Sequence, residues 1–247
     1  MKKSISSSRV NKGFTLIELL VVIAIIGILA AMLLTGISTM KVIGQKTRAS
    51  VEISQIVSAI NKYEADYNRF PIARAAMNSV AVNDDDFTYG GTFLTPPANW
   101  PYSVTASGTY KPDNSEIMAV LLDLDSGVNS AHVMNTKKSQ LLSAKMTSDV
   151  NAPGVGPDGV YRDPWGNPYI ITIDANNDGK ARDAFYQLNA VSAGGLNGLV
   201  KTVLPNNTIV YEVNSPVAVW SAGPDKMIDT NAPANKSKNK DNIVSWK

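Results

Sequence analysis

The chain has 247 residues, enough for one or two domains with a hydrophobic core. Its composition, 44% hydrophobic and 18% charged, is that of a folded protein and excludes the disordered and collagen-like classes. The net charge of +2 does not by itself indicate a nucleic-acid partner. There is no cysteine, so disulfide bonds and thiolate metal sites are excluded.

The chain begins with a short basic segment, residues 1–13, followed by a long apolar run. Without the four basic residues of this segment, 19 Lys and Arg face 21 Asp and Glu, a net charge of about −2. The uncharged run Leu19–Met40 is about 33 Å long as a helix, which is enough to span a bilayer. We therefore expect a membrane helix over residues 14–40 with its N-terminus in the cytoplasm. The alternatives are an ordinary secretory signal and a buried helix of a soluble protein.

Glu18 is the only charged residue within this apolar segment. A carboxylate near the bilayer interior costs about 2.5–3.5 kcal/mol, so it needs a partner. A cut between Gly13 and Phe14 would create an α-amino group four residues away, and a second copy of the chain could also supply that amine. Removal of the basic segment by this cut would thus create the cation that Glu18 needs.

The stretch GFTLIELLVVIAIIGILAA, residues 13–31, resembles the class III signal and first helix of type IV pilins and type II secretion pseudopilins. The resemblance implies that a prepilin peptidase removes residues 1–13 by cutting after Gly13 and methylates the new N-terminal Phe14. It also implies that Glu18 pairs with the N-terminal amine of a neighbouring subunit. Methylation leaves that amine cationic, so the pairing is compatible with it.

A second helical pattern follows the apolar run. Apolar residues recur at three- and four-residue spacing, which predicts an amphipathic helix over residues 41–70 that ends before Pro71. The stripe consists of Ile53, Ile56, Ile60, Tyr63 and Tyr67. We interpret its tyrosines as core residues.

Residues 71–247 are expected to form a periplasmic globular domain. The pattern predicts a helix over Ser115–Asp123 with Ser115 as its cap. Strands are predicted over Tyr169–Ile173, Ala184–Leu188, Thr208–Val213 and Val217–Ser221. This order predicts an α+β fold, in which a long N-terminal helix packs on a small antiparallel β-sheet.

The segment RDPWGNPY, Arg162–Tyr169, resembles a turn of the major, or G-class, pseudopilin. Asp163, Pro164 and Gly166 predict a rigid turn, with Trp165 filling the helix–sheet core. The tail resembles the G-class ending, in which acidic and backbone oxygens bind calcium. The resemblance implies no role for Ile72–Gly159, which is longer than the corresponding region of those proteins.

Two segments are candidate calcium sites, because calcium takes six to eight oxygen ligands. The tail offers Asp225, Asp229 and Asp241, although nearby lysines oppose a cation. The other candidate resembles the first half of an EF-hand loop and consists of Asp174, Asn176, Asp178 and Asp183. Its twelfth position is Phe185 where an EF-hand has glutamate, and a tight turn is the alternative. No other cofactor is expected.

The remaining polar residues indicate no enzyme. Asp84–Asp86 is interpreted as a solvated loop, and His132, the only histidine, as a surface residue. No nucleophile motif is present, so catalytic residues are not expected. A membrane-anchored periplasmic enzyme is the alternative from another functional class.

The sequence thus predicts a structural subunit of a type II secretion pseudopilus in the bacterial inner membrane. The resemblance implies, as partners, copies of the chain, other pseudopilins, prepilin peptidase, an assembly ATPase and an inner-membrane platform protein. The alternative is a type IV or competence-type pilin for adhesion, motility or DNA uptake. The chain lacks a compact basic groove with aromatics, although Lys236, Lys238 and Lys240 allow a basic patch.

Overall fold

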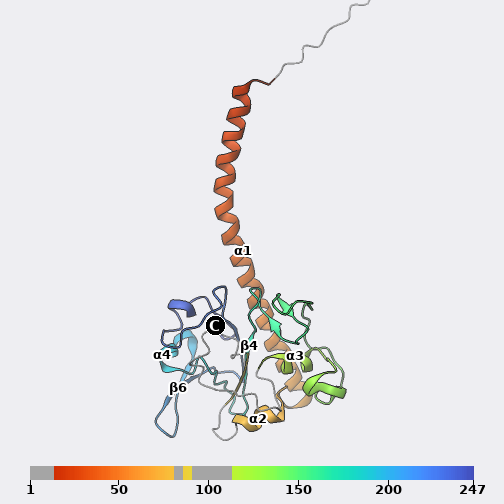
Figure 1. The fold of residues 1–247 in the computed structure, drawn as a ribbon. Helices are drawn as coiled ribbons and strands as arrows, with labels where there is room; N and C mark the ends of the chain where they lie inside the picture. Colours follow the sequence, from red (N-terminus) through yellow and green to blue (C-terminus); the bar gives the residue numbers. More distant parts are fainter. Residues whose placement is uncertain (1–13, 81–85, 91–112) are drawn as a thin grey trace, which may run out of the picture. The chain divides into compact units, whose positions relative to one another are not determined.

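The computed structural model describes residues 14–80, 86–90 and 113–247 (Figure 1). The chain divides into two compact units, Met1–Gly44 and Gln45–Lys247, and each is described here by itself. Helix α1 (Leu16–Tyr67) contributes its first part to the first unit and its second part to the second.

The described part of the first unit is helical and displays large apolar side chains. Phe14 is 75% exposed, Leu16 82% and Met32 70%, and the side chains between them are exposed as well. In the described part of the chain, no helix reaches the combined length and hydropathy of a membrane span.

The second part of α1 buries the stripe that the spacing predicted. Ile53, Ile56, Ile60 and Tyr63 are at most 1% exposed, and Tyr67 is half-buried. The amphipathic pattern is therefore confirmed. The helix ends at Tyr67, three residues before the predicted boundary, because Asn68 adopts a left-handed conformation with φ of 52°.

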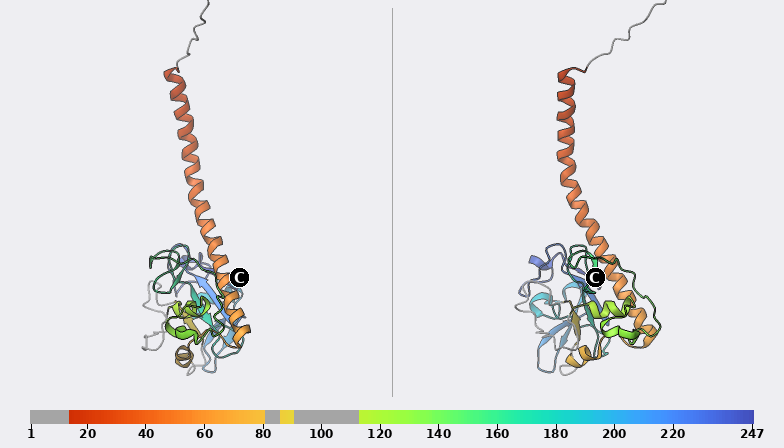
Figure 2. Two further views of the ribbon diagram at one scale, coloured as in Figure 1. Left: turned by 90° about the vertical axis from the view of Figure 1, so that its right-hand side faces the viewer. Right: turned by 45° about the vertical axis from the view of Figure 1, so that its right-hand side comes forward.

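The second unit is built on a four-stranded antiparallel sheet with the order β1-β4-β7-β8. Its strands are β1 (Phe87–Tyr89), β4 (Ile170–Ile173), β7 (Val217–Ser221) and β8 (Ile243–Val244). Two separate hairpins pair β2 (Gly154–Val155) with β3 (Tyr161–Arg162) and β5 (Val200–Val203) with β6 (Ile209–Glu212). The predicted α+β fold is confirmed, because the second part of α1 and this sheet share one hydrophobic cluster (Figure 2).

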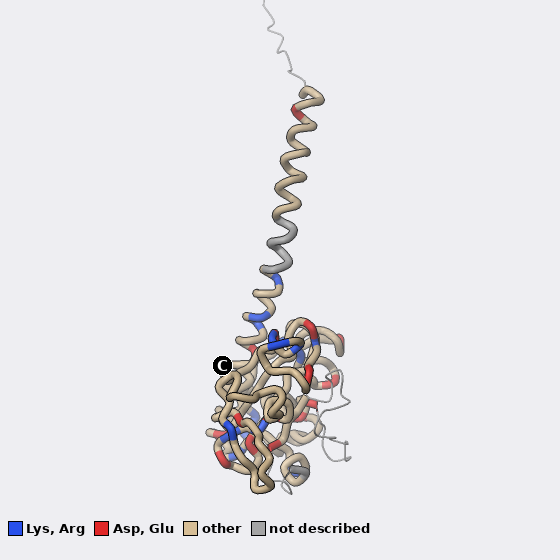
Figure 3. The backbone as a smooth tube through the Cα atoms, turned by 90° about the vertical axis from the view of Figure 1, so that its left-hand side faces the viewer, with Lys and Arg blue, Asp and Glu red and all other residues tan. Residues whose placement is uncertain are grey.

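Short helices complete the unit. They are α2 (Arg74–Val80), α3 (Ser115–Leu121), α4 (Asn189–Ser192), η4 (Gly127–His132), η5 (Leu196–Gly198) and η6 (Ser237–Asn239). Basic and acidic residues are interspersed over the unit (Figure 3). The predicted cap of α3 is wrong: Asn114 occupies the cap position, and the Ser115 backbone N–H and hydroxyl both donate to the Asp113 carboxylate.

The main sheet is covered on both faces, and its strands alternate between them. Ile171 and Val219 pack with the α1 stripe on one face, whereas Ile170 and Trp220 pack in a second cluster on the other. This alternation follows from the period of two in a strand.

The predicted strand Ala184–Leu188 is wrong, because these residues form a turn on the second face. The buried Asp183 carboxylate accepts hydrogen bonds from the backbone N–H groups of Phe185 and Tyr186, at 3.0 and 2.9 Å. These bonds bend the backbone, and the two rings then pack beside Trp220.

Asn114 joins three segments of this fold through its fully buried side chain. The amide donates to the backbone oxygens of Tyr161 and Tyr169, at 2.9 and 2.8 Å, and accepts from the Tyr161 N–H at 2.8 Å. The start of α3 is thereby fixed to β3 and to the residue before β4.

Replacing Asn114 with alanine should lower the free energy of unfolding by about 2–4 kcal/mol, because buried backbone groups lose their partners. Urea denaturation followed by circular dichroism measures this. Asn61→Ala, at an exposed position of α1, is the matched control and should change it by about 0.5 kcal/mol or less. Equal urea midpoints for the two variants would contradict this role of Asn114.

Candidate functional site

The start of α1 is closed by reciprocal hydrogen bonds between Thr15 and Glu18. Glu18 Oε2 accepts from the Thr15 backbone N–H at 2.8 Å and from its hydroxyl at 2.7 Å. The Glu18 N–H in turn donates to Thr15 Oγ1 at 3.3 Å. This is a capping box, and the T-x-x-E spacing of Thr15 and Glu18 would have predicted it.

The capping box places the carboxylate one turn from the predicted processing point. Phe14 is exposed, and Gly13 lies outside the described residues. A carboxylate accepts about four hydrogen bonds, and those from Thr15 use only one of its oxygens. Glu18 therefore retains capacity to accept an ammonium group.

Asp163, Pro164, Trp165 and Gly166 form a closed turn. The buried Asp163 carboxylate accepts from the N–H groups of Trp165 and Asn167, both at 2.9 Å, and from the Ser221 hydroxyl at 2.5 Å. Burial raises the pKa of Asp163 above its ordinary value, and these hydrogen bonds offset only part of the rise. The prediction that Trp165 fills the core is wrong: the turn leaves it half-exposed, and Trp220 is the tryptophan of the core.

The tail brings two of its three predicted calcium ligands together. The Asp225 N–H donates to Asp241 Oδ2 at 3.4 Å, and burial and then the nearby Asp225 raise the pKa of Asp241. The Oδ1 atoms of Asp241 and Asn242 are buried without a hydrogen-bond partner, so this loop has oxygens that a cation would satisfy.

Asp229 is engaged elsewhere in the tail. Its carboxylate accepts from the Asn231 N–H at 3.0 Å, and its own N–H donates to Asn239 at 2.8 Å. Within the described ranges, no group of three or more acidic or histidine side chains is arranged to hold a metal ion.

The second candidate loop uses its oxygens to close a turn. Asp174 accepts from the N–H groups of Asn177 and Gly179, at 2.6 and 2.8 Å. Asn176 and Asp178 each accept a hydrogen bond from the backbone N–H of the residue two positions later. Asp183 lies in the core instead, where it accepts from Thr172 and Trp220.

The acidic run Asp84–Asp86 is only partly described, and its last member is not solvated. Asp86 is 5% exposed and accepts from the N–H groups of Ala175 and Arg182, at 2.8 and 2.7 Å. Burial raises its pKa to about 7. The solvated-loop prediction is wrong for Asp86, whereas Asp84 and Asp85 lie outside the described residues.

His132 and the tail lysines complete the residues that the sequence singled out. The Nδ1 atom of His132 lies 2.7 Å from Asp123 Oδ1, and both side chains are mostly buried. His132 is partly exposed, which agrees with its interpretation as a surface residue, and the pairing with Asp123 is a contact that the sequence did not predict. Lys236 and Lys240 are exposed, and Lys238 is half-buried.

Comparisons with known proteins agree with the N-terminal junction. Residues 8–34 match the prokaryotic N-terminal methylation motif, so the chain carries the motif of prepilin-type proteins. It is similar to type II secretion system core protein G of Pectobacterium carotovorum subsp. carotovorum, at 29% identity over 37% of this chain and 54% of that protein. The same protein of Aeromonas hydrophila is 27% identical over 49% of this chain and 90% of its own length.

A pilus protein is similar to a comparable extent. The type IV wide pilus major component PilA4 of Thermus thermophilus is 32% identical over 39% of this chain and 65% of that protein. No solved structure matches the chain. The resemblance to pilins and major pseudopilins is thus confirmed, although the chain spans only about half of the Pectobacterium protein.

The buried Asp86 should make stability depend on pH. Its pKa in the folded state, about 7, lies above its ordinary value of 3.8, so the folded chain binds the proton more tightly. The resulting stability is complete below about pH 4 and is lost as the pH rises to about 7, by on the order of 4 kcal/mol. Asp86→Asn removes this loss, so its unfolding free energy should rise relative to wild type over that range.

Urea denaturation at several pH values measures the difference. Asp158→Asn is the control, because Arg162 lowers the pKa of Asp158 and that carboxylate stays ionised over the same range. Its difference from wild type should be flat between about pH 5 and 7. A flat difference for Asp86→Asn would contradict the prediction.

Proposed function

We propose that the chain is a structural subunit of a type II secretion pseudopilus. Prepilin peptidase trims it, and copies of it assemble into a helical fibre that drives protein export across the outer membrane. The observation that carries this proposal is the Thr15–Glu18 junction, which opens a helix with exposed apolar side chains. The methylation motif and the similarity to core protein G support it.

Residues 1–13 are the leader in this proposal, with the cut between Gly13 and Phe14. Residues 14–40 anchor the chain in the inner membrane, with the N-terminus in the cytoplasm and the globular unit in the periplasm. Before assembly, lipid covers the exposed apolar side chains of α1. In the fibre, the helices of other copies cover them.

Glu18 sets the register between copies. In an apolar environment its carboxylate needs a cation, and the methylated amine of a neighbour's Phe14 supplies one. Copies displaced along the fibre would leave both charges unpaired, so only one axial step is favoured. Other pseudopilins share this fibre, and an assembly ATPase and an inner-membrane platform protein extract the subunits from the membrane.

A type IV or competence-type pilin is the second candidate, and the similarity to the Thermus pilus component favours it. The two candidates share the processing and fibre steps. DNA uptake would require salt-dependent DNA binding, for which Lys236, Lys238 and Lys240 are the candidate residues. The pseudopilin is favoured because core protein G recurs among the relatives. Neither role requires catalysis.

Glu18→Val should abolish fibre assembly, because the Phe14 amine loses its partner. Electron microscopy of fibres sheared from cells that express the chain with a secretion system measures assembly. Intact mass should still show loss of residues 1–13 and a methyl group on Phe14, which separates assembly from processing. Thr15→Val, which removes the hydroxyl of the cap but keeps the carboxylate, is the control and should still assemble.

Normal fibres from Glu18→Val would refute the register mechanism. A full-length wild-type chain, or one cut after the apolar run, would refute processing by prepilin peptidase, and the proposed function with it.

We also propose that the tail loop binds calcium. Asp225 and Asp241 would provide carboxylate ligands, and the buried oxygens of Asp241 and Asn242 that lack hydrogen-bond partners support the proposal. The ion would offset the repulsion between the two carboxylates and brace the loop against β7 and β8.

Calcium at 100 times its Kd should stabilise the folded chain by about 2.7 kcal/mol. The melting temperature of the full chain in calcium and in chelator measures this. Asp241→Asn should remove the calcium response, whereas Asp178→Asn, in the other candidate loop, should keep it. The opposite pattern would place the ion in the Asp174–Asp183 loop, and an unchanged wild-type melting temperature would exclude both sites.

A further inference from the structure

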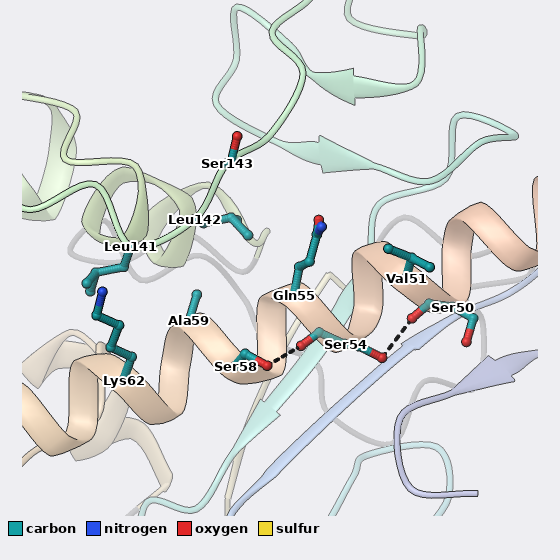
Figure 4. A pocket seen from close by; sticks show the side chains of 10 residues that line it. All are labelled: Ser50, Val51, Ser54, Gln55, Ser58, Ala59, Lys62, Leu141, Leu142 and Ser143. Carbon is teal, nitrogen blue, oxygen red and sulfur yellow. Dashed lines mark hydrogen bonds between the residues drawn. The ribbon is translucent and has the colours of Figure 1, made fainter.

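An open groove runs along the second part of α1, beside the segment Leu141–Ser143 (Figure 4). Its volume is about 460 Å³. We propose that this groove receives the apolar helix of a second copy, residues 14–40, in the assembled fibre. The proposal rests on the proposed function and names the surface through which globular units hold neighbouring helices.

The α1 side of the groove combines short side chains with the longer Gln55 and Lys62. Ser50, Ser54 and Ser58 recur every four residues, and the hydroxyls of the last two donate back to the helix, at 3.0 and 2.8 Å. The Ser54 and Ser58 hydroxyls thus have acceptors within the helix, so an apolar neighbour leaves neither of them unpaired. Short side chains at this spacing also allow two helices to approach closely.

The opposite wall is fixed in place before any partner arrives. The backbone N–H groups of Leu141 and Leu142 donate to the Leu121 oxygen, at 2.8 and 3.1 Å. The chain just before this wall is attached to α1, because the Tyr63 hydroxyl donates to the Met134 oxygen at 2.8 Å and the Tyr67 hydroxyl to Asn135 at 2.7 Å. The groove is thus preformed, and its wall comes from the region to which the resemblance assigns no role.

The lining selects for an uncharged partner. Val51, Ala59, Leu141 and Leu142 contribute apolar surface, and among the residues that the structure describes no acidic one lines the groove. Lys62 is the cation among the described lining residues and stands at one end, beside Leu141 (Figure 4). The groove therefore neither attracts a basic segment nor requires an acidic one along most of its length.

The same chain carries the matching helix. Leu19–Met40 is uncharged, and large side chains of its described part are exposed in the single copy: Ile23 is 60% exposed, Ile26 58% and Leu29 55%. The α1 side of the groove, Ser50–Lys62, is about 20 Å long and accommodates between three and four helical turns. Because the groove lies on α1 itself, it continues the interface that the proposed fibre forms along this helix.

Ser54→Trp fills the groove and should reduce fibre yield at least tenfold, measured by electron microscopy and by recovery of sheared fibres. Lys201→Trp, on the exposed face of β5, is the matched control and should assemble like wild type. Normal fibres from Ser54→Trp would overturn the inference and leave the proposed function intact. If wild type itself forms no fibres, the proposed function fails and the inference falls with it.

Cross-linking tests the contact without blocking it, and the absence of native cysteine removes background. Ser54→Cys is combined with a single cysteine scanned over Leu19–Met32, and wild-type-like fibres are treated with a bis-maleimide. We expect covalent dimers at positions spaced three or four residues apart, and none when Lys201→Cys replaces Ser54→Cys. Fibres without such dimers, or cross-links only to another protein, would overturn the inference.

Discussion

The second unit depends on one contact, between the apolar stripe of α1 and one face of the main sheet. Ile53, Ile56 and Ile60 fill this contact, and Ile171 and Val219 meet them from the sheet. A polar link lies beside it: the Tyr169 hydroxyl donates to Glu52 at 2.5 Å, and Arg48 pairs with the same carboxylate at 2.8 Å. A carboxylate buried this far would be costly without both partners, so the link fixes where along the sheet the helix packs.

That contact also determines what α1 leaves uncovered. The sheet buries one stripe of the helix, whereas Ser50, Ser54 and Ser58 and the neighbouring Val51 remain exposed. An isolated chain gains nothing from an apolar groove in water, since a groove exposes surface that a flat face would bury. A preformed groove on the helix that begins with the methylation motif is therefore consistent with the proposed contact between copies.

The sequence pattern correctly predicted the regular elements of the fold, in which the repeat of the backbone determines which side chains are buried. The stripe of α1 followed from spacing, and the strands Thr208–Val213 and Val217–Ser221 from β-branched and aromatic residues between turns; β7 has the predicted bounds. Two of the failures share one cause, namely side chains that bind backbone groups. Asp183 turns Ala184–Leu188 away from a strand, and Asp163 closes the turn that exposes Trp165. Such bonds depend on burial from distant segments, which a local pattern does not contain.

The residues of the candidate site also differ in whether local sequence or long-range folding determines their contacts. The Thr15–Glu18 capping box is local and readable from the sequence, whereas the burial of Asp86 and the approach of Asp225 to Asp241 arise only on folding.

The capping box also constrains the proposed assembly. It holds the carboxylate against the first turn of α1, where uncovered backbone N–H groups already favour negative charge. In the proposed fibre, a neighbour's amine would meet an acid whose position is fixed beforehand, so pairing would cost less side-chain entropy than for a freely rotating glutamate. The hydrogen bonds that begin the helix in one copy would thus position the same carboxylate for the amine of the next copy in the proposed fibre.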